Sequence, residues 1–403
     1  MNILTISMSD LLGGAAIASY RLHQALKREG HVSRMLVGYR ASDDPDVAQL
    51  PHPGKINQWV EKLSTRVGLP YTTIRPTFGI PREKWFEEAD VLCLHNLHGR
   101  YFNFLALPRL LAAKPAVTTL HDMWLFTNGN PFDPRFMVDP SGADGGGLQW
   151  RLKRRVFSQC SMVVATPSGW MAGLARRSIL GRYPVHHVPL GLDLGVFRPC
   201  DREHARARWS LPADRTVLMA MAETLTDPRK GIDLLRDALR QLPAGVRRRC
   251  VLLSVGHHAA TALQDVGMDV IDVGYLDDEQ DKAVAFSAAD LLIFPTRADN
   301  MPLVILEAMA CGTPAVSFDV GGVREMVRKG ETGLLARAED AGDLGARILE
   351  AVELPELTGE MRRRCRVIAE IEYSDRLQVS RYVELFDEAA TTSKKVTPCS
   401  GPR

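Results

Sequence analysis

Residues 297–314 of the chain, RADNMPLVILEAMACGTP, lead from a polar loop directly into an apolar helical segment. The first N–H groups of such a helix, here those of Met301, Leu303 and Val304, have no partner within the helix, and phosphate oxygens are readily held there. Pro302 has no N–H to lose and therefore suits the first helical turn. The pattern predicts a buried helix whose N-terminus holds a polyanion.

Two carboxylates, Asp299 and Glu307, flank these N–H groups, and Asn300 follows the first of them. If the residues between the carboxylates are mostly helical, the carboxylates lie about 12 Å apart, roughly the length of a sugar, a diphosphate and a ribose in a row. Carboxylates accept hydrogen bonds from hydroxyl groups, so the stretch predicts a ligand with hydroxyls at both ends and phosphates between them. The alternative interpretation is an amphipathic helix, 303–310, that only packs on a sheet, because acidic residues are common at helix starts.

The length of the chain, 403 residues, favours two domains of about 170 to 190 residues each. Hydrophobic residues make up 45% and charged residues 24% of the chain, and the formal net charge is +2, so there is no overall signal for nucleic acid. Aromatic residues are not interleaved among the arginine-rich runs, which also argues against a nucleic-acid partner. One such run, 151–155, would suit contact with anionic lipid, although basic runs are more often solvated helix faces.

The seven cysteines are widely spaced and form no Cys-x-x-Cys pair, which argues against both a disulfide framework and a zinc site. The N-terminus has no basic region ahead of an apolar segment, and no stretch of about 18 apolar residues occurs. We therefore expect a cytoplasmic protein, with peripheral contact at the inner face of the membrane if the acceptor is membrane-bound.

Short apolar runs alternate with amphipathic stretches in both halves of the chain, which predicts an α/β fold with doubly wound parallel sheets. Residues 188–199 carry Pro and Gly at both ends and are typical of a linker, which a single long barrel would not need. The predicted strands are 3–7, 33–37, 91–95, 117–121, 162–166 and 186–189 in the first half, and 216–221, 251–255, 269–273, 291–295, 315–318 and 333–335 in the second.

Two glycines, Gly13 and Gly14, follow the first predicted strand and precede a helix. Paired glycines allow a backbone to approach a ligand closely, and the helix N-terminus supplies positive potential. A tight turn without a ligand fits the same residues. The three glycines of a dinucleotide fingerprint are missing, which argues against a nicotinamide enzyme.

Polar residues also follow two other strands of the first half. His121 and Asp122 come at the end of one strand, and Asn96 and His98 follow another. A neutral imidazole can donate to a sugar hydroxyl, and a backbone carbonyl can stabilise positive charge. Satisfied polar groups in ordinary loops are the alternative interpretation.

In the second half, Arg229 and Lys230 lie between a predicted strand and a helix. Arg can bind two phosphate oxygens and Lys adds a mobile point charge, so the pair suits a diphosphate. A surface charge pair is the alternative.

These motifs together resemble those of glycosyltransferase family 4, retaining enzymes of the GT-B architecture. The resemblance rests on an acidic residue, seven intervening residues and Glu307, followed by Ala-Met-Ala-Cys-Gly-Thr-Pro. The block His-Asp-Met-Trp-x-Phe-Thr is similar to one branch of the family that acts in bacterial polysaccharide and glycoconjugate synthesis. Most members have Glu where this chain has Asp299, and some have a further Arg where it has Thr224.

The resemblance implies two Rossmann-like domains that face a central cleft, with a C-terminal helix crossing back to the N-terminal domain. Residues 1–190, with about 374–390, would form the acceptor-binding domain. Residues 191–373 would form the donor-binding domain, and residues 391–403 a flexible tail.

The resemblance also implies roles for individual residues. His121, Asp299, Arg229 and Lys230 would be catalytic, and Asn96, His98 and Asp122 would bind the acceptor. Strand ends at Gly256 and Gly274 would flank the base of the nucleotide. The implied donor-binding set is Gly13, Gly14, Arg229, Lys230, Gly256, Tyr275, Leu276, Asp299, Asn300, Met301, Pro302, Leu303, Val304 and Glu307.

The function implied is transfer of a sugar from a nucleoside diphosphate sugar, of UDP or GDP type, to a hydroxyl acceptor. No Asp-x-Asp pair follows a strand, so no metal and no other cofactor is expected. Two alternatives stay open: a nucleotide-sugar 2-epimerase of the same architecture, and a non-catalytic partner that has kept the fold. The departure at Asp299 is the feature that favours the last of these.

Overall fold

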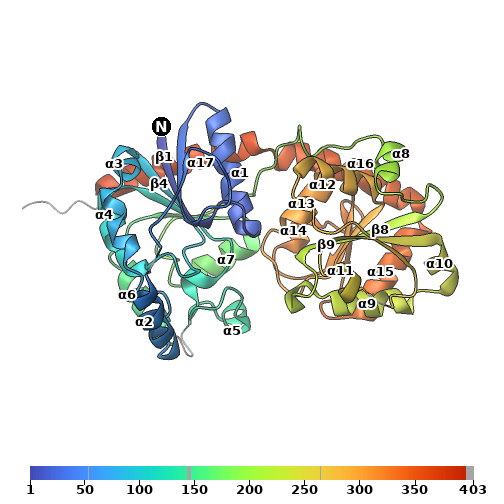
Figure 1. Ribbon diagram of the computed structural model, residues 1–403, viewed down its shortest axis with the longest axis horizontal. Coiled ribbons are helices and arrows are strands. Elements are labelled where there is room, and N and C mark those ends of the chain that lie inside the picture. Colours follow the sequence, from blue (N-terminus) through green and yellow to red (C-terminus); the bar gives the residue numbers. More distant parts are fainter. Residues whose placement is uncertain (53, 143–146, 264, 396–403) are drawn as a thin grey trace, which may run out of the picture. The chain divides into compact units, whose positions relative to one another are not determined.

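The computed structural model describes residues 1–52, 54–142, 147–263 and 265–395 (Figure 1). The chain divides into two compact units: unit 1 is Met1–Gly191 with Asp375–Arg403, and unit 2 is Leu192–Ser374. Each unit is a parallel sheet covered by helices, as the alternation of apolar runs predicts.

Within the described residues, the sheet of unit 1 has seven parallel strands in the order β3-β2-β1-β4-β5-β6-β7. Its strands are β1 Asn2–Ser9, β2 Val32–Tyr39, β3 Val47–Gln49, β4 Val91–His95, β5 Ala116–Thr119, β6 Val163–Thr166 and β7 Val185–His187. Its helices are α1 Gly14–Arg28, α2 Lys55–Arg66, α3 Lys84–Glu88, α4 Leu107–Ala113, α5 Pro134–Val138, α6 Leu148–Phe157, α7 Gly169–Arg177 and α17 Asp375–Lys395, with 3-10 turns η1 Pro76–Arg82, η2 Phe104–Ala106 and η3 Trp124–Phe126.

The sheet of unit 2 has six parallel strands among the described residues, in the order β10-β9-β8-β11-β12-β13. Its strands are β8 Thr216–Thr224, β9 Cys250–His257, β10 Asp269–Asp272, β11 Leu291–Phe294, β12 Ala315–Phe318 and β13 Gly333–Ala336. Its helices are α8 Arg202–Arg208, α9 Ile232–Gln241, α10 Ala244–Arg249, α11 Ala259–Ala262, α12 Glu279–Ala288, α13 Leu303–Ala310, α14 Val323–Met326, α15 Ala341–Glu353 and α16 Pro355–Glu372, with the 3-10 turn η4 Pro228–Lys230.

The strands are buried on both faces because helices cover both sides of each sheet. In unit 1, Leu4 and Ile6 of β1 belong to one apolar cluster, and Ile3 belongs to another on the opposite face. This is the alternation expected of a pleated strand. Continuous apolar strands of this kind are typical of parallel sheets, so the apolar runs in the sequence predict their positions.

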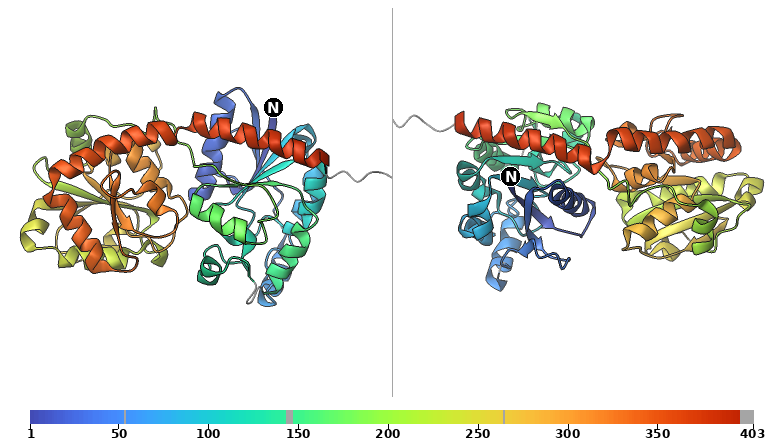
Figure 2. Two further views of the ribbon diagram at one scale, coloured as in Figure 1. Left: turned by 180° about the vertical axis from the view of Figure 1, so that it is seen from behind. Right: turned by 90° about the horizontal axis from the view of Figure 1, so that it is seen from above.

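The C-terminal helix α17 packs on unit 1, as Figure 2 shows. Tyr382 and Phe386 of this helix are buried in the cluster that contains Ile3 of β1 and Leu22 of α1. The Tyr382 hydroxyl lies 2.9 Å from Oγ1 of Thr119 at the end of β5. The predicted return of the C-terminal helix to the N-terminal domain is therefore confirmed.

Three expectations need correction. Strand β3 was not predicted, because three residues are too short for a clear alternation. The predicted strand 117–121 ends at Thr119, which places His121 in the loop that follows. Helix α17 continues to Lys395, so residues 391–395 are helical and not part of a tail; residues 396–403 lie outside the described residues.

Each sheet has one point at which the strand order changes direction. In unit 1 this point lies between β1 and β4, and in unit 2 it lies between β8 and β11. Loops that leave the carboxyl ends of such a strand pair diverge to opposite faces, and ligands of doubly wound folds bind in the crevice that this creates. The sheet order thus indicates the loops after these four strands as candidate ligand-binding loops.

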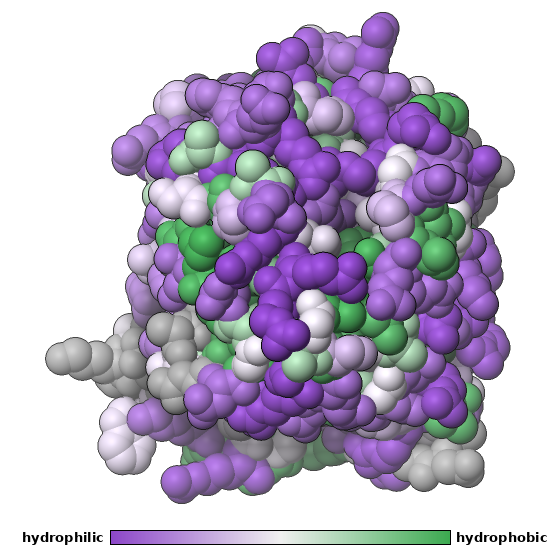
Figure 3. Space-filling view, turned by 90° about the vertical axis from the view of Figure 1, so that its right-hand side faces the viewer, coloured by the Kyte–Doolittle hydropathy of each residue, from purple (hydrophilic) through white to green (hydrophobic). Residues whose placement is uncertain are grey.

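The face of the molecule in Figure 3 is mostly hydrophilic, with hydrophobic residues in small separate groups. None of the helices in the described ranges combines the length and the apolar composition that a membrane span requires. The structure also contains no group of three metal-ligating side chains within those residues.

Candidate active site

The loop after β8 carries the two predicted phosphate-binding cations. Asp227 caps the short turn η4, because its Oδ1 accepts a hydrogen bond from the Arg229 N–H at 2.9 Å. Gly231 ends the turn with φ of 66°, and a Cβ there would lie 1.9 Å from the Pro295 carbonyl oxygen. Only glycine fits this position, which fixes the loop after β8 against the loop after β11.

The Asp299 carboxylate lies against both cations. Its Oδ2 is 3.0 Å from Lys230 Nζ and 3.3 Å from Arg229 Nη1, and it accepts a hydrogen bond from Thr296 Oγ1 at 3.1 Å. Arg229 Nη1 also donates to the Ala298 carbonyl at 3.1 Å. The loops after β8 and β11 thus bring two positive charges and one negative charge together at the point where the strand order of unit 2 changes direction.

Arg297 braces these two loops, a role that the sequence interpretation did not assign. Its guanidinium forms two hydrogen bonds with Asp233 of α9, at 2.9 and 2.7 Å, and one with Glu339 at 3.0 Å. Its backbone N–H donates to the Arg229 carbonyl at 2.9 Å. The hydrogen bonds that Arg297 donates to Asp233 raise the pKa of Arg297 above its usual range, although burial opposes this. The sequence gives one indication of this role: Arg297, a basic residue in addition to Arg229 and Lys230, lies two positions before Asp299.

Helix α13 has the bounds, Leu303–Ala310, that the sequence predicts for an amphipathic helix. Pro302 is its N-cap, with ψ of 121°, and the first helical residue is Leu303. In the spacer between Asp299 and Glu307, residues 303–306 are helical and residues 300–302 are not, so a helical rise applies to only part of the spacer. The Ile305 N–H bonds to the Pro302 carbonyl at 3.1 Å, so the N–H groups of Leu303 and Val304 precede the helical ladder.

The residues around this helix start are buried. Asn300 is 3% exposed, Met301 and Leu303 are each 8% exposed, and Glu307 is 4% exposed. The Gly322 N–H donates to the Asp299 carbonyl at 3.2 Å. Burial of a carboxylate costs free energy unless the carboxylate is hydrogen-bonded or paired with a positive charge. Glu307 is therefore held in a specific position and does not belong to a solvated helix face.

The ends of β9 and β10 form the remaining part of this edge of unit 2. Gly256 has φ of 135°, and its N–H donates to the Gly274 carbonyl at 2.8 Å. The Tyr275 ring stacks on His257 with centroids 4.5 Å apart and planes at 8°. Burial raises the pKa of Tyr275, and the negative charges of Glu223, Asp277 and Glu307 add to this. Leu276 is buried beside them. His257 was not predicted, since it carries no motif.

In unit 1, Gly13 is the N-cap of α1, with φ of 84°, and Gly14 is the first helical residue. The loop that precedes them is held by Asp10, whose carboxylate accepts hydrogen bonds from Ala41 N and Ser42 N at 2.8 Å each. Burial opposes ionisation of Asp10, but the hydrogen bonds from Ser42 and Ala41 outweigh it and lower its pKa. The glycines thus lie on a fixed loop after β1, and Asp10 is an anchor that sequence reasoning missed.

His121 is part of a buried chain of polar groups. Its Nε2 lies 2.9 Å from Nδ1 of His95, and His95 Nε2 lies 3.1 Å from Sγ of Cys93. Burial lowers the pKa of His121 to about 4, although the Asp122 carboxylate raises it and His98 lowers it further. Burial and the neighbouring His121 likewise hold the pKa of His95 well below its usual value. Both imidazoles are therefore neutral near pH 7.

The three residues predicted for the acceptor lie after β4 and β5. His98 Nε2 is 2.8 Å from Asp122 Oδ2, and Asp122 Oδ1 accepts a hydrogen bond from Trp124 N at 2.8 Å. Asn96 has φ of 46°, unusual for a residue with a side chain. Its Oδ1 is buried without a hydrogen-bond partner among the described residues. An unpaired buried oxygen, two residues before His98 in the chain, fits a ligand hydroxyl.

The basic run of residues 151–155 is not the uniformly solvated face that the sequence suggests. Lys153 is fully buried, with Nζ 3.6 Å from the centroid of the Trp124 ring and 3.2 Å from the Thr127 carbonyl oxygen. Burial holds the pKa of Lys153 well below its usual range. At least one cation of the run thus belongs to the core under η3 and does not face a membrane.

Two family models match the chain. The model described as Glycosyltransferase Family 4 matches residues 12–196, and the model described as Glycosyl transferases group 1 matches residues 215–353. The first match covers most of unit 1 and continues to residue 196, just inside unit 2, and the second lies wholly in unit 2.

Among the curated relatives is the D-inositol 3-phosphate glycosyltransferase of Saccharomonospora viridis, 32% identical over 94% of this chain and 89% of the relative. The enzyme of the same name from Geodermatophilus obscurus is 32% identical over 52% of this chain and 50% of the relative. That from Catenulispora acidiphila is 31% identical over 63% of this chain and 61% of the relative. The chain thus spans between about half and nine tenths of the length of these relatives.

Similar solved structures support the same fold. A sucrose-phosphate synthase from Thermosynechococcus elongatus has a TM-score of 0.71 and 21% identity, covering 96% of this chain and 98% of its own. HepE of Anabaena, in complex with UDP and glucose, has a TM-score of 0.67 and 18% identity, covering 96% and 99%. The parallel sheets of both units and these similar structures show the GT-B fold. The relative from Saccharomonospora viridis, which is 32% identical over 94% of this chain, and the two family models show that this protein belongs to glycosyltransferase family 4.

Proposed function

We propose that the protein transfers a sugar, with retention of anomeric configuration, from a nucleoside diphosphate sugar to a hydroxyl group of an acceptor. The observation that carries this proposal is the cluster of Arg229, Lys230 and Asp299 at the carboxyl ends of β8 and β11. Two cations and a carboxylate in one place suit a ligand in which a diphosphate adjoins a polyol.

The leaving group sets the electrostatic task. As the glycosidic bond breaks, negative charge grows on the diphosphate, and Arg229 and Lys230 stabilise it together with the first N–H groups of α13. Because the loops that carry these groups are fixed by Gly231 and Arg297, the donors need little reorganisation. Preorganised donors of this kind contribute several kcal/mol of transition-state stabilisation.

The carboxylates of unit 2 are assigned to hydroxyl groups. Asp299, next to both cations, is assigned to the hydroxyls of the transferred sugar, and Glu307 to the ribose diol. The stacked pair of His257 and Tyr275 offers an aromatic surface for the base, and the charge of Glu307 acts on Tyr275, which agrees with a ribose and a base held side by side.

Unit 1 supplies the remaining groups in this proposal. His121, neutral and hydrogen-bonded to His95, is assigned to the donor sugar, where its backbone carbonyl stabilises the positive charge of the oxocarbenium-like ring. Asn96, His98 and Asp122 are assigned to the acceptor. For retention, the acceptor oxygen attacks from the side of the leaving group. Its proton passes to a phosphate oxygen of the departing diphosphate, so the products are a glycoside and a protonated nucleoside diphosphate.

A UDP-type donor is proposed first, because HepE is described in complex with UDP and glucose. A GDP-type donor is the second choice. Charge neutralisation of the diphosphate is assigned to Arg229 and Lys230, and we propose that turnover needs no added metal. A 2-epimerase is not favoured by the family matches, and incubation with donor alone separates the two activities. An epimerase would convert the donor, whereas a transferase would at most hydrolyse it slowly.

The proposal is tested by a thermal-shift screen against UDP, GDP, ADP and dTDP sugars. A ligand that binds only the folded state raises the melting temperature, and about 100-fold excess over its Kd contributes about 2.7 kcal/mol. We expect a UDP or GDP sugar to give the largest shift. If none of the four classes stabilises the protein, the proposed donor is wrong.

A further inference from the structure

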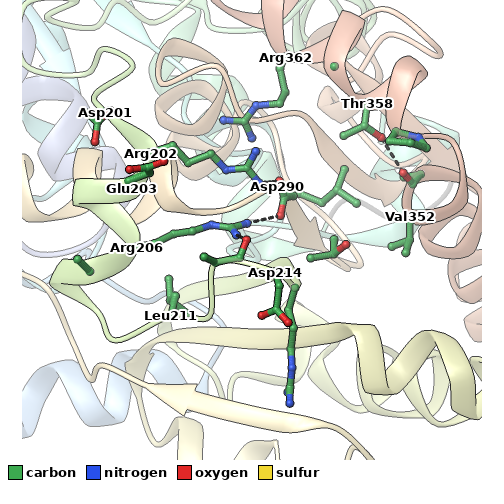
Figure 4. Close-up of a pocket in the computed structure, with 18 residues that line it drawn as sticks. Asp201, Arg202, Glu203, Arg206, Leu211, Asp214, Asp290, Val352, Thr358 and Arg362 are labelled. Atoms are coloured by element: carbon green, nitrogen blue, oxygen red, sulfur yellow. Dashed lines mark hydrogen bonds and ion pairs between the residues drawn. The ribbon is translucent and has the colours of Figure 1, made fainter.

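A large cavity, of about 1050 Å³, lies within unit 2 away from the proposed donor site (Figure 4). It is lined by Thr216 and Leu291, at the starts of β8 and β11, and by residues of α8 and α16. Arg229, Lys230 and Asp299 follow the ends of the same two strands. Because the starts and ends of parallel strands lie at opposite edges of a sheet, the cavity is separate from the donor site.

Three arginines of this cavity gather around a single carboxylate. Arg202 and Arg206 of α8 each form an ion pair with Asp290, the latter at 2.8 Å from Nη2 to Oδ2. The Asp290 carboxylate also accepts a hydrogen bond from Val217 N at 2.8 Å. Oδ1 thus accepts a hydrogen bond from Arg202, and Oδ2 accepts hydrogen bonds from Arg206 and Val217 N.

The third arginine, Arg362 of α16, has no ion pair among the described residues. Its Nη1 donates to the Ala289 carbonyl at 2.6 Å. In Figure 4 the guanidinium groups of Arg362 and Arg202 approach each other from two different helices, beside the carboxylate of Asp290. A side chain held at one nitrogen by a backbone carbonyl still has several N–H donors to offer to a ligand.

The positive charge of this corner is incompletely offset. Burial lowers the pKa of Arg362 and of Arg206; the Asp290 carboxylate opposes this effect, whereas the like charge of Arg202 adds to it. Burial is the largest cause of both shifts, and Asp214 also opposes the shift of Arg206. An anion bound beside the guanidinium groups would favour their charged forms.

In the described part of the chain, the other acidic residues of the cavity form no ion pair with Arg362. Asp201 caps α8, because its Oδ1 accepts a hydrogen bond from His204 N at 2.8 Å. Asp214 lies on the side of Arg206 away from Arg362 in Figure 4, and Glu203 projects from the first turn of α8. The cavity as a whole carries both signs of charge, and the surplus of positive charge is local to Arg202 and Arg362.

We propose that this cavity binds a small molecule that bears a phosphate group, with the phosphate between Arg202 and Arg362. Each arginine can bind two phosphate oxygens through two parallel hydrogen bonds. The single carboxylate of Asp290 cannot accept all the N–H groups that the arginines offer. The rest of the molecule lies along Val352, Pro355 and Thr358, which form the less polar wall. The volume is that of a site for a ligand of metabolite size.

The test is calorimetric titration of the whole protein with inorganic phosphate and, separately, with glucose 6-phosphate, both in the presence of saturating UDP. UDP occupies the proposed donor site, so further binding reports on another site. We expect Arg362→Gln and Arg202→Gln each to weaken binding of the phosphate probe at least tenfold. Arg208→Gln is the matched control, because Arg208 lies on α8 beside the cavity-lining residues and pairs with Asp281 instead.

Tighter binding of glucose 6-phosphate than of inorganic phosphate would identify a phosphate ester as the ligand, and equal binding would identify the phosphate group alone. Absence of binding by both probes, or unchanged binding in both variants, would overturn the proposal. If loss of the Arg362 bond to Ala289 prevents folding, Arg202→Gln alone decides, since 45% of the Arg202 side chain is exposed. If UDP itself does not bind, the donor assignment fails while the response of the phosphate probes to the two variants still tests this site.

Discussion

Lys230 and Asp299 belong to loops that follow different strands of unit 2, and their side chains meet with Nζ 3.0 Å from Oδ2. The two residues are 69 positions apart in the chain. The same carboxylate also contacts Arg229 and Thr296, so any diphosphate that binds the two cations shares them with Asp299. Asp299 therefore orients the Lys230 side chain, and in the proposed complex it would also lie next to the diphosphate.

Removal of the Lys230 charge is expected to lower kcat/KM strongly. Lys230→Ala should cost about 2 to 4 kcal/mol of transition-state stabilisation, since the charge acts on a leaving group that becomes more negative as the bond breaks. Steady-state kinetics with the donor found in the thermal-shift screen measure this. Lys329→Ala, at an exposed position of the same unit, should leave kcat/KM unchanged. Turnover near that of the wild type in Lys230→Ala would remove this residue from the phosphate site.

Replacement of Asp299 should separate catalysis from nucleotide binding. Asp299→Asn keeps the size of the side chain but removes the negative charge beside Arg229 and Lys230, so affinity for the nucleoside diphosphate should be equal or higher. The turnover number should fall, because the amide no longer accepts hydroxyl hydrogen bonds with both oxygens. Calorimetry with UDP and a kcat measurement test the two parts. An equal loss of affinity and of kcat would contradict the assignment of Asp299 to the sugar.

The turn after β8 should not tolerate a side chain at Gly231. Gly231→Ala places a Cβ 1.9 Å from the Pro295 carbonyl oxygen at φ of 66°, and the resulting strain should cost more than about 1 kcal/mol in the free energy of unfolding. Urea unfolding measures the loss. Gly359→Ala is the matched control: no atom lies within 4 Å of the added Cβ, and alanine is favoured in helix α16 by about 0.5 to 1 kcal/mol. A Gly231→Ala protein as stable as the wild type would show that the loops after β8 and β11 are not fixed in this way.

Acid should destabilise unit 1 through its buried histidines. The pKa of His121 is about 4 in the folded protein, below the unfolded value near 6.5, and that of His95 is lowered as well. The unfolded chain therefore takes up protons that the folded chain does not. The free energy of unfolding should be highest above about pH 6.5 and should fall as the pH drops towards 4.

Urea unfolding at pH 7.5, 6 and 5 measures this dependence on pH. His121→Asn should reduce the slope, and His204→Asn, at an exposed position of α8, should leave it unchanged. A wild-type stability that is constant or rises between pH 6.5 and 5 would show that these imidazoles are accessible to protons in the folded state.

Removal of divalent metal should not reduce turnover if Arg229 and Lys230 neutralise the diphosphate. We expect the same kcat in excess EDTA as in Mg²⁺. A loss of activity with EDTA that Mg²⁺ restores would assign part of this electrostatic task to a metal ion carried by the donor.

Much of the fold was readable from the sequence because the strands of parallel sheets are continuous apolar runs. All twelve predicted runs coincide with strands β1, β2 and β4 to β13, to within a few residues at the ends. Strand β3, Val47–Gln49, escaped because a three-residue edge strand between turns has no periodicity to detect.

The candidate site was only partly readable. The loops that carry Arg229, Lys230 and Asp299 were identified by residue type and spacing, but their pairing depends on which strands are neighbours, and neighbouring strands are far apart in the sequence. The supporting residues Asp10, Arg297 and His257 escaped for a similar reason, since their importance lies in partners that the order of the chain does not reveal. Lys153 shows the opposite case: its basic run predicts a solvated side chain, whereas the structure buries it.

The claim that the two cations of unit 2 hold a diphosphate is tested most directly by calorimetry of UDP and of uridine with the wild type and with a protein that carries both Arg229→Ala and Lys230→Ala. We predict that UDP binds the wild type much more tightly than uridine does, and that the double substitution removes most of this difference while leaving uridine binding unchanged. If the preference for UDP over uridine is the same in both proteins, the diphosphate is held elsewhere and the account of the donor site is wrong.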